Sequence, residues 1–182
     1  MTGDDLRRLN AGPTAPIVLV GLSGSGKSTV GRLLADRWAV PFIDLDLVIE
    51  RDAGASIPQI FRLEGESGFR AREAAVTRNL APAGPCVIAT GGGWMDRAEL
   101  RDAWPGAVRV WLQVRPHVAA ERLAASPGSR PLLENEPPES VLQDLLARRL
   151  PAYRLSDYTV DTSDRTPAQV AEAVAAKITT ET

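Results

Sequence analysis

The chain has 182 residues, 44% of them hydrophobic, and a formal net charge of −2 at pH 7. This length suits one domain with a sizeable core, and the charge gives no reason to expect a nucleic-acid partner. A single cysteine and a single histidine exclude an intrachain disulfide framework and a cluster of cysteine or histidine metal ligands. We expect no membrane partner either, because no apolar run approaches the ~18 residues of a membrane span.

Residues 1–15 are polar and lack the apolar stretch of a secretory signal. We therefore expect them to form a disordered leader. The remaining residues, 16–182, are expected to form a single domain in the cytoplasm.

Short apolar runs alternate with helical patterns along the rest of the chain. Five runs have the length and composition of buried parallel strands, at residues 17–20, 41–43, 86–89, 108–114 and 158–161. Helical patterns lie between and after them, at residues 30–38, 60–63, 69–80, 99–103, 118–125, 141–155 and 170–178. Strands that alternate with helices predict an α/β fold, a three-layer αβα sandwich with a five-stranded parallel sheet.

Local signals add detail to these elements. Capping patterns are expected to open three of the helices, at residues 56–59, 96–99 and 166–169. Leu33 should lie on the inward face of its helix, and Pro151 should kink or divide the helix that contains it. The stretch at 126–138 is rich in proline, glycine, serine and charge, and therefore predicts a mobile loop.

The nine residues after the first predicted strand, 21–29, read Gly-Leu-Ser-Gly-Ser-Gly-Lys-Ser-Thr and match G-x-x-x-x-G-K-[ST] in full. We call them the phosphate loop. Its glycines let the backbone wrap around phosphates with the N–H groups inward, and the start of the next helix adds its dipole. Lys27 would reach the β- and γ-phosphates, and Ser28 would offer its hydroxyl to Mg²⁺. The expected nucleotide-binding residues here are Gly24, Ser25, Gly26, Lys27, Ser28 and Thr29.

The phosphate loop alone does not choose among classes of nucleotide-binding protein. A guanine-nucleotide switch would need an Asn-Lys-x-Asp segment after a later strand, and the sequence has none. A motor or a large ATPase would need a much longer chain. The class that remains is a small-molecule kinase that uses ATP and Mg²⁺.

Two aspartates, Asp44 and Asp46, follow the second predicted strand. In an extended stretch, residues two apart point the same way, so both carboxylates would face the phosphate loop. One could hold the metal through water, and the other could accept a hydrogen bond from the attacking hydroxyl. The alternative interpretation is a solvated acidic turn.

These residues, with others along the chain, make the sequence resemble the shikimate kinases. The match covers almost the whole chain from Ile17 onward. Six segments carry it, in the right order and at the right separations. They are Asp44-Leu45-Asp46, residues 57–61, Gly65-Glu66-Ser67-Gly68-Phe69-Arg70 with Glu73, Gly91-Gly92-Gly93, Arg130-Pro131-Leu132-Leu133, and Arg149-Leu150-Pro151-Ala152-Tyr153. Trp94 departs from the pattern, because the family more often has a small residue after the triple glycine.

The resemblance implies a fold like that of the nucleoside monophosphate kinases. It implies a helical substrate-binding insertion near residues 45–73 and a mobile lid near residues 124–138. The implied reaction is transfer of a phosphoryl group from MgATP to the 3-hydroxyl of shikimate, a step of aromatic amino-acid biosynthesis. The expected partner is this small molecule, and the enzyme is expected to be a monomer.

The resemblance also implies roles for residues on the substrate side. Asp46 would bind the substrate hydroxyls and orient the attacking one or act as its base, while Asp44 would reach Mg²⁺ through water. Arg70 and Arg149 would clamp the substrate carboxylate, because a guanidinium fork matches a carboxylate bidentately. Gly92 would let the backbone approach a substrate hydroxyl.

Two further arginines are implied on the nucleotide side. On the lid, Arg130 would swing onto the transferring phosphoryl group and stabilise its charge. Arg165 would lie beside the adenine. The expected catalytic residues are thus Lys27, Asp46 and Arg130.

Two rival functions stay open at this stage. A sugar-acid kinase of gluconate type shares the phosphate loop, similar paired aspartates and an anionic substrate. Against it, Asp46 is followed by Leu47-Val48, whereas that family places a His-Pro pair soon after its aspartates. A nucleotide-binding regulator without transfer chemistry would have no need of a carboxylate clamp or a catalytic lid.

Overall fold

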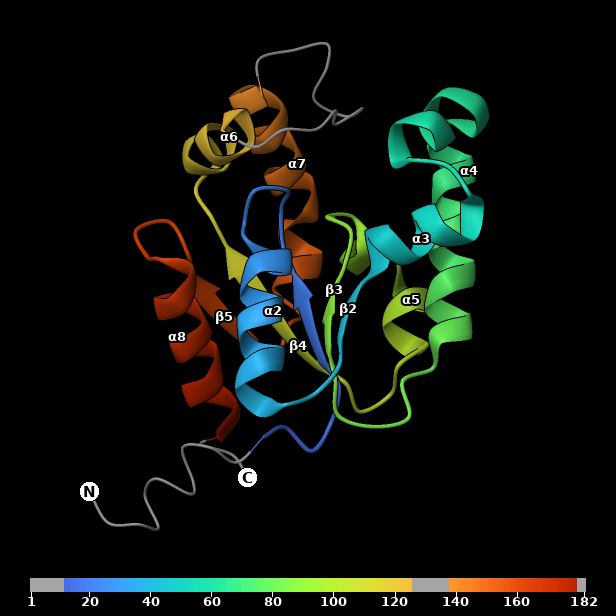
Figure 1. The fold of residues 1–182 in the computed structure, drawn as a ribbon. Helices are drawn as coiled ribbons and strands as arrows, with labels where there is room; N and C mark the ends of the chain where they lie inside the picture. The colour runs from blue at the N-terminus through green and yellow to red at the C-terminus, as the bar shows by residue number, and fades with distance from the viewer. Residues whose placement is uncertain (1–11, 126–137, 180–182) are drawn as a thin grey trace, which may run out of the picture.

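The computed structural model describes residues 12–125 and 138–179. Its centre is a five-stranded sheet of order β2-β3-β1-β4-β5, in which every pairing is parallel (Figure 1). The strands are β1 (Ile17–Val20), β2 (Phe42–Asp44), β3 (Val87–Ala89), β4 (Val108–Gln113) and β5 (Tyr158–Asp161). The five predicted strands are confirmed, with boundaries that differ by one residue at most.

Helices cover both faces of the sheet (Figure 1). The α-helices are α2 (Lys27–Trp38), α3 (Leu45–Ala53), α4 (Ile57–Leu80), α5 (Ala98–Asp102), α6 (Pro116–Ala124), α7 (Pro138–Tyr153) and α8 (Pro167–Thr179), with a short 3-10 helix η1 (Trp94–Asp96). In β1, Ile17 packs into the core beneath α2 and α8, whereas Val18 packs into the core on the opposite face. Alternate side chains of one strand are thus buried on opposite faces, as the predicted three-layer sandwich requires.

Two of the three capping predictions are confirmed. The Gln59 side chain accepts from the Ser56 N–H at 2.8 Å, and the Gln169 side chain accepts from the Thr166 N–H at 2.9 Å. The prediction at 96–99 is wrong, because Asp96 ends η1 and Arg97 is the residue that precedes α5.

Helix α4 combines the two helices predicted at 60–63 and 69–80. The join is Gly65, whose φ of 69° and ψ of −176° are not helical. This region of backbone space is essentially open to glycine alone, so Gly65 bends the chain where another residue would be strained. Two helical segments therefore lie on either side of Gly65, as predicted, but they are joined into one kinked helix.

One prediction about an individual helix residue is wrong, and another is wrong in one of its two parts. Leu33 is 39% exposed instead of lying inward. The buried face of α2 is narrower than the spacing of its apolar residues predicts, and Leu33 lies outside it. Of the two outcomes predicted for Pro151, a kink or a division, the division is wrong, because α7 continues to Tyr153. The proline lies in the last turn, where the helix loses one hydrogen bond and then ends.

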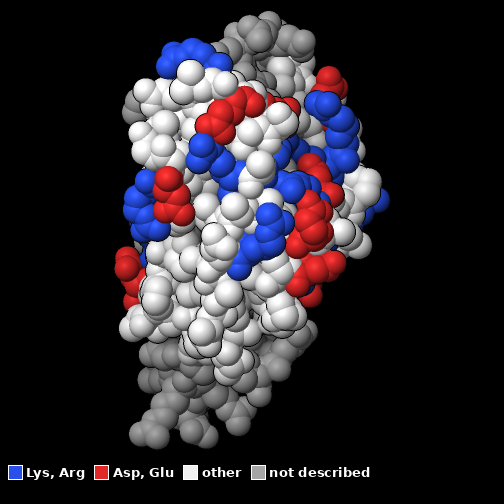
Figure 2. Space-filling view, turned by 90° about the vertical axis from the view of Figure 1, so that its right-hand side faces the viewer, with Lys and Arg blue, Asp and Glu red and all other residues white. Residues whose placement is uncertain are grey.

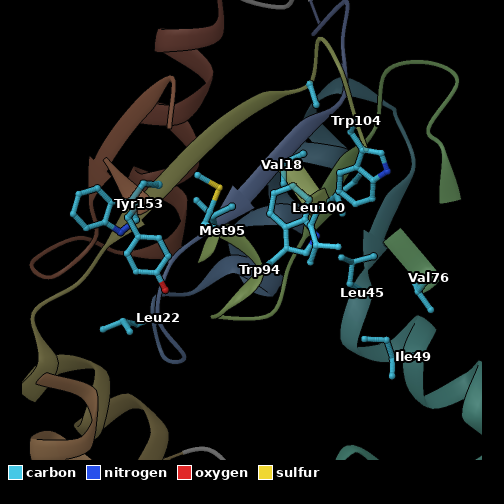
Figure 3. Packing of buried hydrophobic residues seen from close by; sticks show 14 of the residues in the cluster. Val18, Leu22, Leu45, Ile49, Val76, Trp94, Met95, Leu100, Trp104 and Tyr153 are labelled. Atoms are coloured by element: carbon cyan, nitrogen blue, oxygen red, sulfur yellow. The ribbon is translucent and has the colours of Figure 1, made fainter. Parts of the chain in front are cut away.

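Trp94 is a core residue, not part of the pocket rim. It is fully buried, its Nε1 donates to Oγ1 of Thr77 at 3.1 Å, and its ring stacks on Trp104 with centroids 5.1 Å apart (Figure 3). A buried indole needs such a partner for its N–H. The residue that departs from the family pattern therefore anchors η1 to the body of the protein.

The predicted leader and lid lie mostly outside the described residues. Residues 12–15 precede β1, and Pro13 among them is buried. Of the lid range, the structure describes Ala124 and Ala125 at the end of α6 and Pro138 at the start of α7. Within the described ranges, no helix is long and apolar enough to cross a membrane.

The side of the molecule formed by α3 and α4 is charged but mixed in sign. Figure 2 shows basic and acidic side chains interspersed over this face. One pair is Arg72 with Glu64, which are joined by hydrogen bonds of 2.9 and 2.7 Å across the Gly65 bend. No single-sign surface of the kind that binds polyanions is visible in this view.

Candidate active site

The phosphate loop connects the end of β1 to the start of α2, as predicted. Gly21, Gly24 and Gly26 have φ values of 139°, 80° and 93°, which other residues rarely adopt. Gly24 also needs its small size, because a Cβ there would lie 2.7 Å from the Ala119 carbonyl oxygen. Lys27 folds back over the loop, and its Nζ donates to the carbonyl oxygens of Gly21 and Leu22 at 2.8 Å each.

A cavity of about 560 Å³ opens beside this loop. It is lined by phosphate-loop residues 23–29 and by residues from β2, α3, the loop after β3, α6 and the loop before α8. The lining outside the phosphate loop includes Asp44, Asp46, Thr90, Gly92, Arg122, Thr162, Arg165 and Pro167. Most of the residues predicted to bind a nucleotide or a substrate hydroxyl therefore share one cavity.

The side chains predicted to hold Mg²⁺ lie together on the cavity wall. Oγ of Ser28 donates to Oδ2 of Asp44 at 2.6 Å. A hydroxyl and a carboxylate are the hard oxygen donors that Mg²⁺ prefers, and the metal keeps several waters in sites of this kind. The pair therefore fits a magnesium ion carried in with a nucleotide.

The prediction that Asp44 and Asp46 belong to one extended stretch is wrong. Asp44 ends β2 and is the N-cap of α3, and its Oδ1 accepts from the Asp46 N–H at 3.1 Å. An N-cap carboxylate starts a helix in this way, so Asp46 lies in the first turn of α3. Both carboxylates nevertheless line the cavity, as predicted.

Asp46 occupies an unusual electrostatic environment. Burial raises the pKa of its carboxyl to about 6, and nearby carboxylates, led by Asp44, add to the rise while Lys27 opposes it. Its Oδ1 is buried and has no hydrogen-bond partner among the described residues. Such an acceptor is costly to leave unpaired, so it is suited to a ligand hydroxyl that donates to it.

The three glycines after β3 each make room for a charged side chain. A Cβ on Gly91 would lie 2.6 Å from Oε1 of Glu73, and one on Gly92 would lie 2.9 Å from Nη1 of Arg149. A Cβ on Gly93 would lie 2.8 Å from Nη2 of Arg70. The triple glycine therefore allows the two predicted clamp arginines and a buried glutamate to converge on one turn.

Arg70 is held by two carboxylates of its own helix. Its Nη1 pairs with Oε2 of Glu73 at 2.9 Å, and its Nη2 pairs with Oε1 of Glu66 at 3.2 Å. Glu73 is fully buried, whereas Glu66 is 56% exposed. Because buried pairs are screened least, the contact with Glu73 fixes the arginine.

Arg149 is buried beside the same turn. Its Nε lies 3.3 Å from Oδ2 of Asp96, and it also interacts with the hydroxyl of Tyr153. That hydroxyl donates to the Gly92 carbonyl oxygen at 2.6 Å, and burial raises the tyrosine pKa. Tyr153 is thereby kept neutral, as a donor that fixes the backbone of the glycine turn.

The remaining predictions and one omission concern the nucleotide side. Arg165 lines the cavity, whereas Arg130 lies outside the described residues. Sequence reasoning missed Arg122 on α6, which also lines the cavity and donates to the carbonyl oxygens of Gly24 and Thr162 at 3.3 and 2.6 Å. No motif marks it, because its position depends on how α6 packs against the phosphate loop.

The known proteins that this chain resembles include kinases of the predicted family. The family model described as shikimate kinase matches residues 23–179. A shikimate kinase of Parasynechococcus marenigrum (strain WH8102) is 42% identical over 158 residues, which cover 87% of this chain and 83% of that protein.

Solved structures give the same result. A shikimate kinase from Acinetobacter baumannii in complex with shikimate is 40% identical with a TM-score of 0.81, covering 94% of this chain and 93% of its own. A gluconokinase from Sinorhizobium meliloti 1021 is less similar, at 26% identity and a TM-score of 0.62, covering 93% of this chain and 96% of its own. The chain belongs to the shikimate kinase family.

Proposed function

We propose that this protein transfers the γ-phosphoryl group of ATP to the 3-hydroxyl of shikimate, producing shikimate 3-phosphate and ADP. One observation carries the proposal: the phosphate loop, an unpaired buried carboxylate and two arginines converge around one glycine turn. The solved relative that contains shikimate shares this fold at 40% identity.

On the nucleotide side, the phosphate-loop amides and Lys27 bind the phosphates of ATP. Ser28 and, through water, Asp44 would hold Mg²⁺, which would supply positive charge to neutralise the phosphates of ATP. Arg165 lines the cavity and would contact the adenine, and Arg122 lines the same cavity. From the lid, we propose that Arg130 closes onto the transferring phosphoryl group.

On the acceptor side, Arg70 and Arg149 bind the shikimate carboxylate, because both guanidinium groups face the glycine turn at residues 91–93. The Gly92 backbone and Asp46 bind ring hydroxyls. Glu73 orients Arg70 and brings its own unpaired Oε1 to the same turn. The substrate class is therefore a small carboxylate that carries hydroxyl groups.

The transfer itself needs positioning and charge neutralisation more than covalent chemistry. The 3-hydroxyl oxygen forms a bond to the γ-phosphorus as the bond to the β,γ-bridging oxygen breaks, and ADP leaves. The hydroxyl proton passes to Asp46, whose pKa of about 6 leaves it ionised yet able to accept a proton near neutral pH. Lid closure excludes water and limits wasted hydrolysis of ATP.

We also propose that the enzyme acts as a monomer in the cytoplasm, where ATP is available. The phosphate loop, both aspartates and both arginines of the proposed clamp are all supplied by this one chain.

A coupled assay of ADP release with shikimate, gluconate or no acceptor tests the proposed function. We expect release that depends on shikimate, with gluconate and water each giving a small fraction of that rate. Equal rates with gluconate would favour the sugar-acid kinase, and release in none of the mixtures would favour a regulator.

Replacing Arg70 with alanine should raise the KM for shikimate by about 10²-fold and leave the KM for ATP within about twofold. A charge-assisted, bidentate contact with a carboxylate is lost, at a cost on the order of 2–3 kcal/mol. Arg78→Ala is the matched control, because Arg78 is exposed on the same helix. Equal increases in both KM values would refute the clamp.

A further inference from the structure

The 3-10 helix η1 carries a carboxylate, Asp96, to which the proposed function assigns no role in binding either the nucleotide or the acceptor. Oδ2 of Asp96 lies 3.3 Å from Nε of Arg149. The aspartate is 39% exposed at its side chain, whereas the arginine is 9% exposed. This is therefore not a surface ion pair between two mobile side chains, because one partner is fixed in the protein interior.

The turn that holds Asp96 is itself firmly anchored. Trp94 and Met95, the two preceding residues, are fully buried (Figure 3). The Trp94 indole N–H also donates a hydrogen bond to Oγ1 of Thr77. The Asp96 N–H donates to the Gly93 carbonyl oxygen at 3.2 Å, and Arg101 donates to the Met95 carbonyl oxygen. The carboxylate is therefore presented to Arg149 from a rigid support.

The contact also determines which edge of the arginine is available. A guanidinium can bind a carboxylate side-on, through Nε and one Nη, or end-on, through both Nη atoms. Asp96 occupies the Nε position, while Nη1 lies against Gly92 in the turn that faces the cavity. Of these two arrangements, only the end-on one leaves the contact between Nε and Asp96 intact, and the Tyr153 hydroxyl is a further neighbour of the same guanidinium.

We propose that Asp96 is a positioning residue that holds Arg149 by Nε and so presents its two Nη groups to the substrate carboxylate. This inference rests on the proposed function, in which Arg149 is one half of the clamp. An arginine held in its binding rotamer loses less side-chain freedom when the substrate arrives, so the substrate binds more tightly.

Asp96 also has a charge effect that must be separated from its positioning effect. Its negative charge, close to the clamp, opposes the binding of an anion. Asp96→Asn removes this charge but keeps an oxygen that can accept from Nε, whereas Asp96→Ala removes both. The difference between the two variants therefore isolates the contact with Nε.

Steady-state kinetics on the full chain provide the first test. We expect the KM for shikimate of Asp96→Ala to be at least about fivefold above that of Asp96→Asn, with KM for ATP and kcat similar in both. Asp102→Ala, at the exposed end of α5, is the control and should match the wild type. Equal KM values for shikimate in the two Asp96 variants would overturn the proposal.

A second measurement needs no substrate and no turnover. The Arg149 Nε–H resonance, assigned in ¹H–¹⁵N spectra by its absence in Arg149→Lys, should be protected from exchange with water in the wild type and in Asp96→Asn. Loss of that protection in Asp96→Ala supports the contact, and unchanged protection refutes it. An enzyme that shows the contact but fails to phosphorylate shikimate would instead refute the proposed function.

Discussion

Replacing Asp46 with asparagine is expected to lower kcat by about 10³-fold, the range that a positioned general base contributes. The amide has nearly the same shape as the carboxylate but cannot take the proton of the attacking hydroxyl. Because the amide oxygen could still accept a hydrogen bond from that hydroxyl, binding should suffer less than turnover. The KM for shikimate should therefore change by less than about tenfold.

The pH dependence of the wild type should identify the same group. Because the pKa of Asp46 in the substrate-free protein is about 6, kcat/KM for shikimate should fall as the pH drops through that value. Protonation of the carboxyl removes the group that accepts the proton of the attacking hydroxyl. The value of kcat/KM therefore falls as the pH is lowered. The fall should be absent in Asp46→Asn, whereas a fall caused by titration of the nucleotide would persist in the variant.

The free energy of unfolding shows whether the loss of activity expected for Asp46→Asn is caused by unfolding. Burial raises the pKa of Asp46 from 3.8 to about 6, so the free energy of unfolding decreases as the pH rises between these values. The cost of keeping the carboxylate ionised above pH 6 is about 3 kcal/mol. Asp46→Asn should therefore be at least as stable as the wild type in urea at pH 7.5. A less stable variant would contradict this view of the site.

Replacing Lys27 with alanine should lower kcat/KM for ATP by about 10³-fold, because it removes the charged donor that we propose for the transferring phosphates. Its Nζ is held by the phosphate loop's own carbonyl oxygens, and Lys27 lines the cavity proposed for the nucleotide. Lys27→Arg should restore little of this loss, since a planar fork does not replace a compact ammonium group.

The chain offers a matched control for Lys27. Lys177, the other lysine, lies on α8 with its Nζ 6.0 Å from the centre of the Tyr158 ring. Lys177→Ala should leave both kinetic constants for ATP unchanged. Similar losses in the two variants would contradict the specific role of Lys27.

The strands and the phosphate loop could be predicted because their signals are local. Short β-branched runs and a glycine pattern of fixed spacing need no knowledge of tertiary packing. The resemblance predicts the two arginines of the proposed clamp in the same way, by short segments in a fixed order. The structure then placed Arg70 and Arg149 beside one glycine turn.

Features that depend on packing or on competition between elements could not be predicted. Asp46 was expected in an extended stretch, but the N-cap hydrogen bond of Asp44 starts a helix there. Asp96 was expected to open a helix, but the buried Trp94 fixes it in η1 instead. Arg122 reaches the phosphate loop only because α6 packs against it, and one sequence carries no signal of that contact.

The most direct test of the central claim is to identify the product after incubation with MgATP and shikimate. We predict one new phosphate ester, located by ³¹P and ¹H NMR on the 3-hydroxyl of shikimate, formed in equal amount to ADP. A phosphate on another hydroxyl, or ADP formed without any shikimate phosphate, would contradict the account.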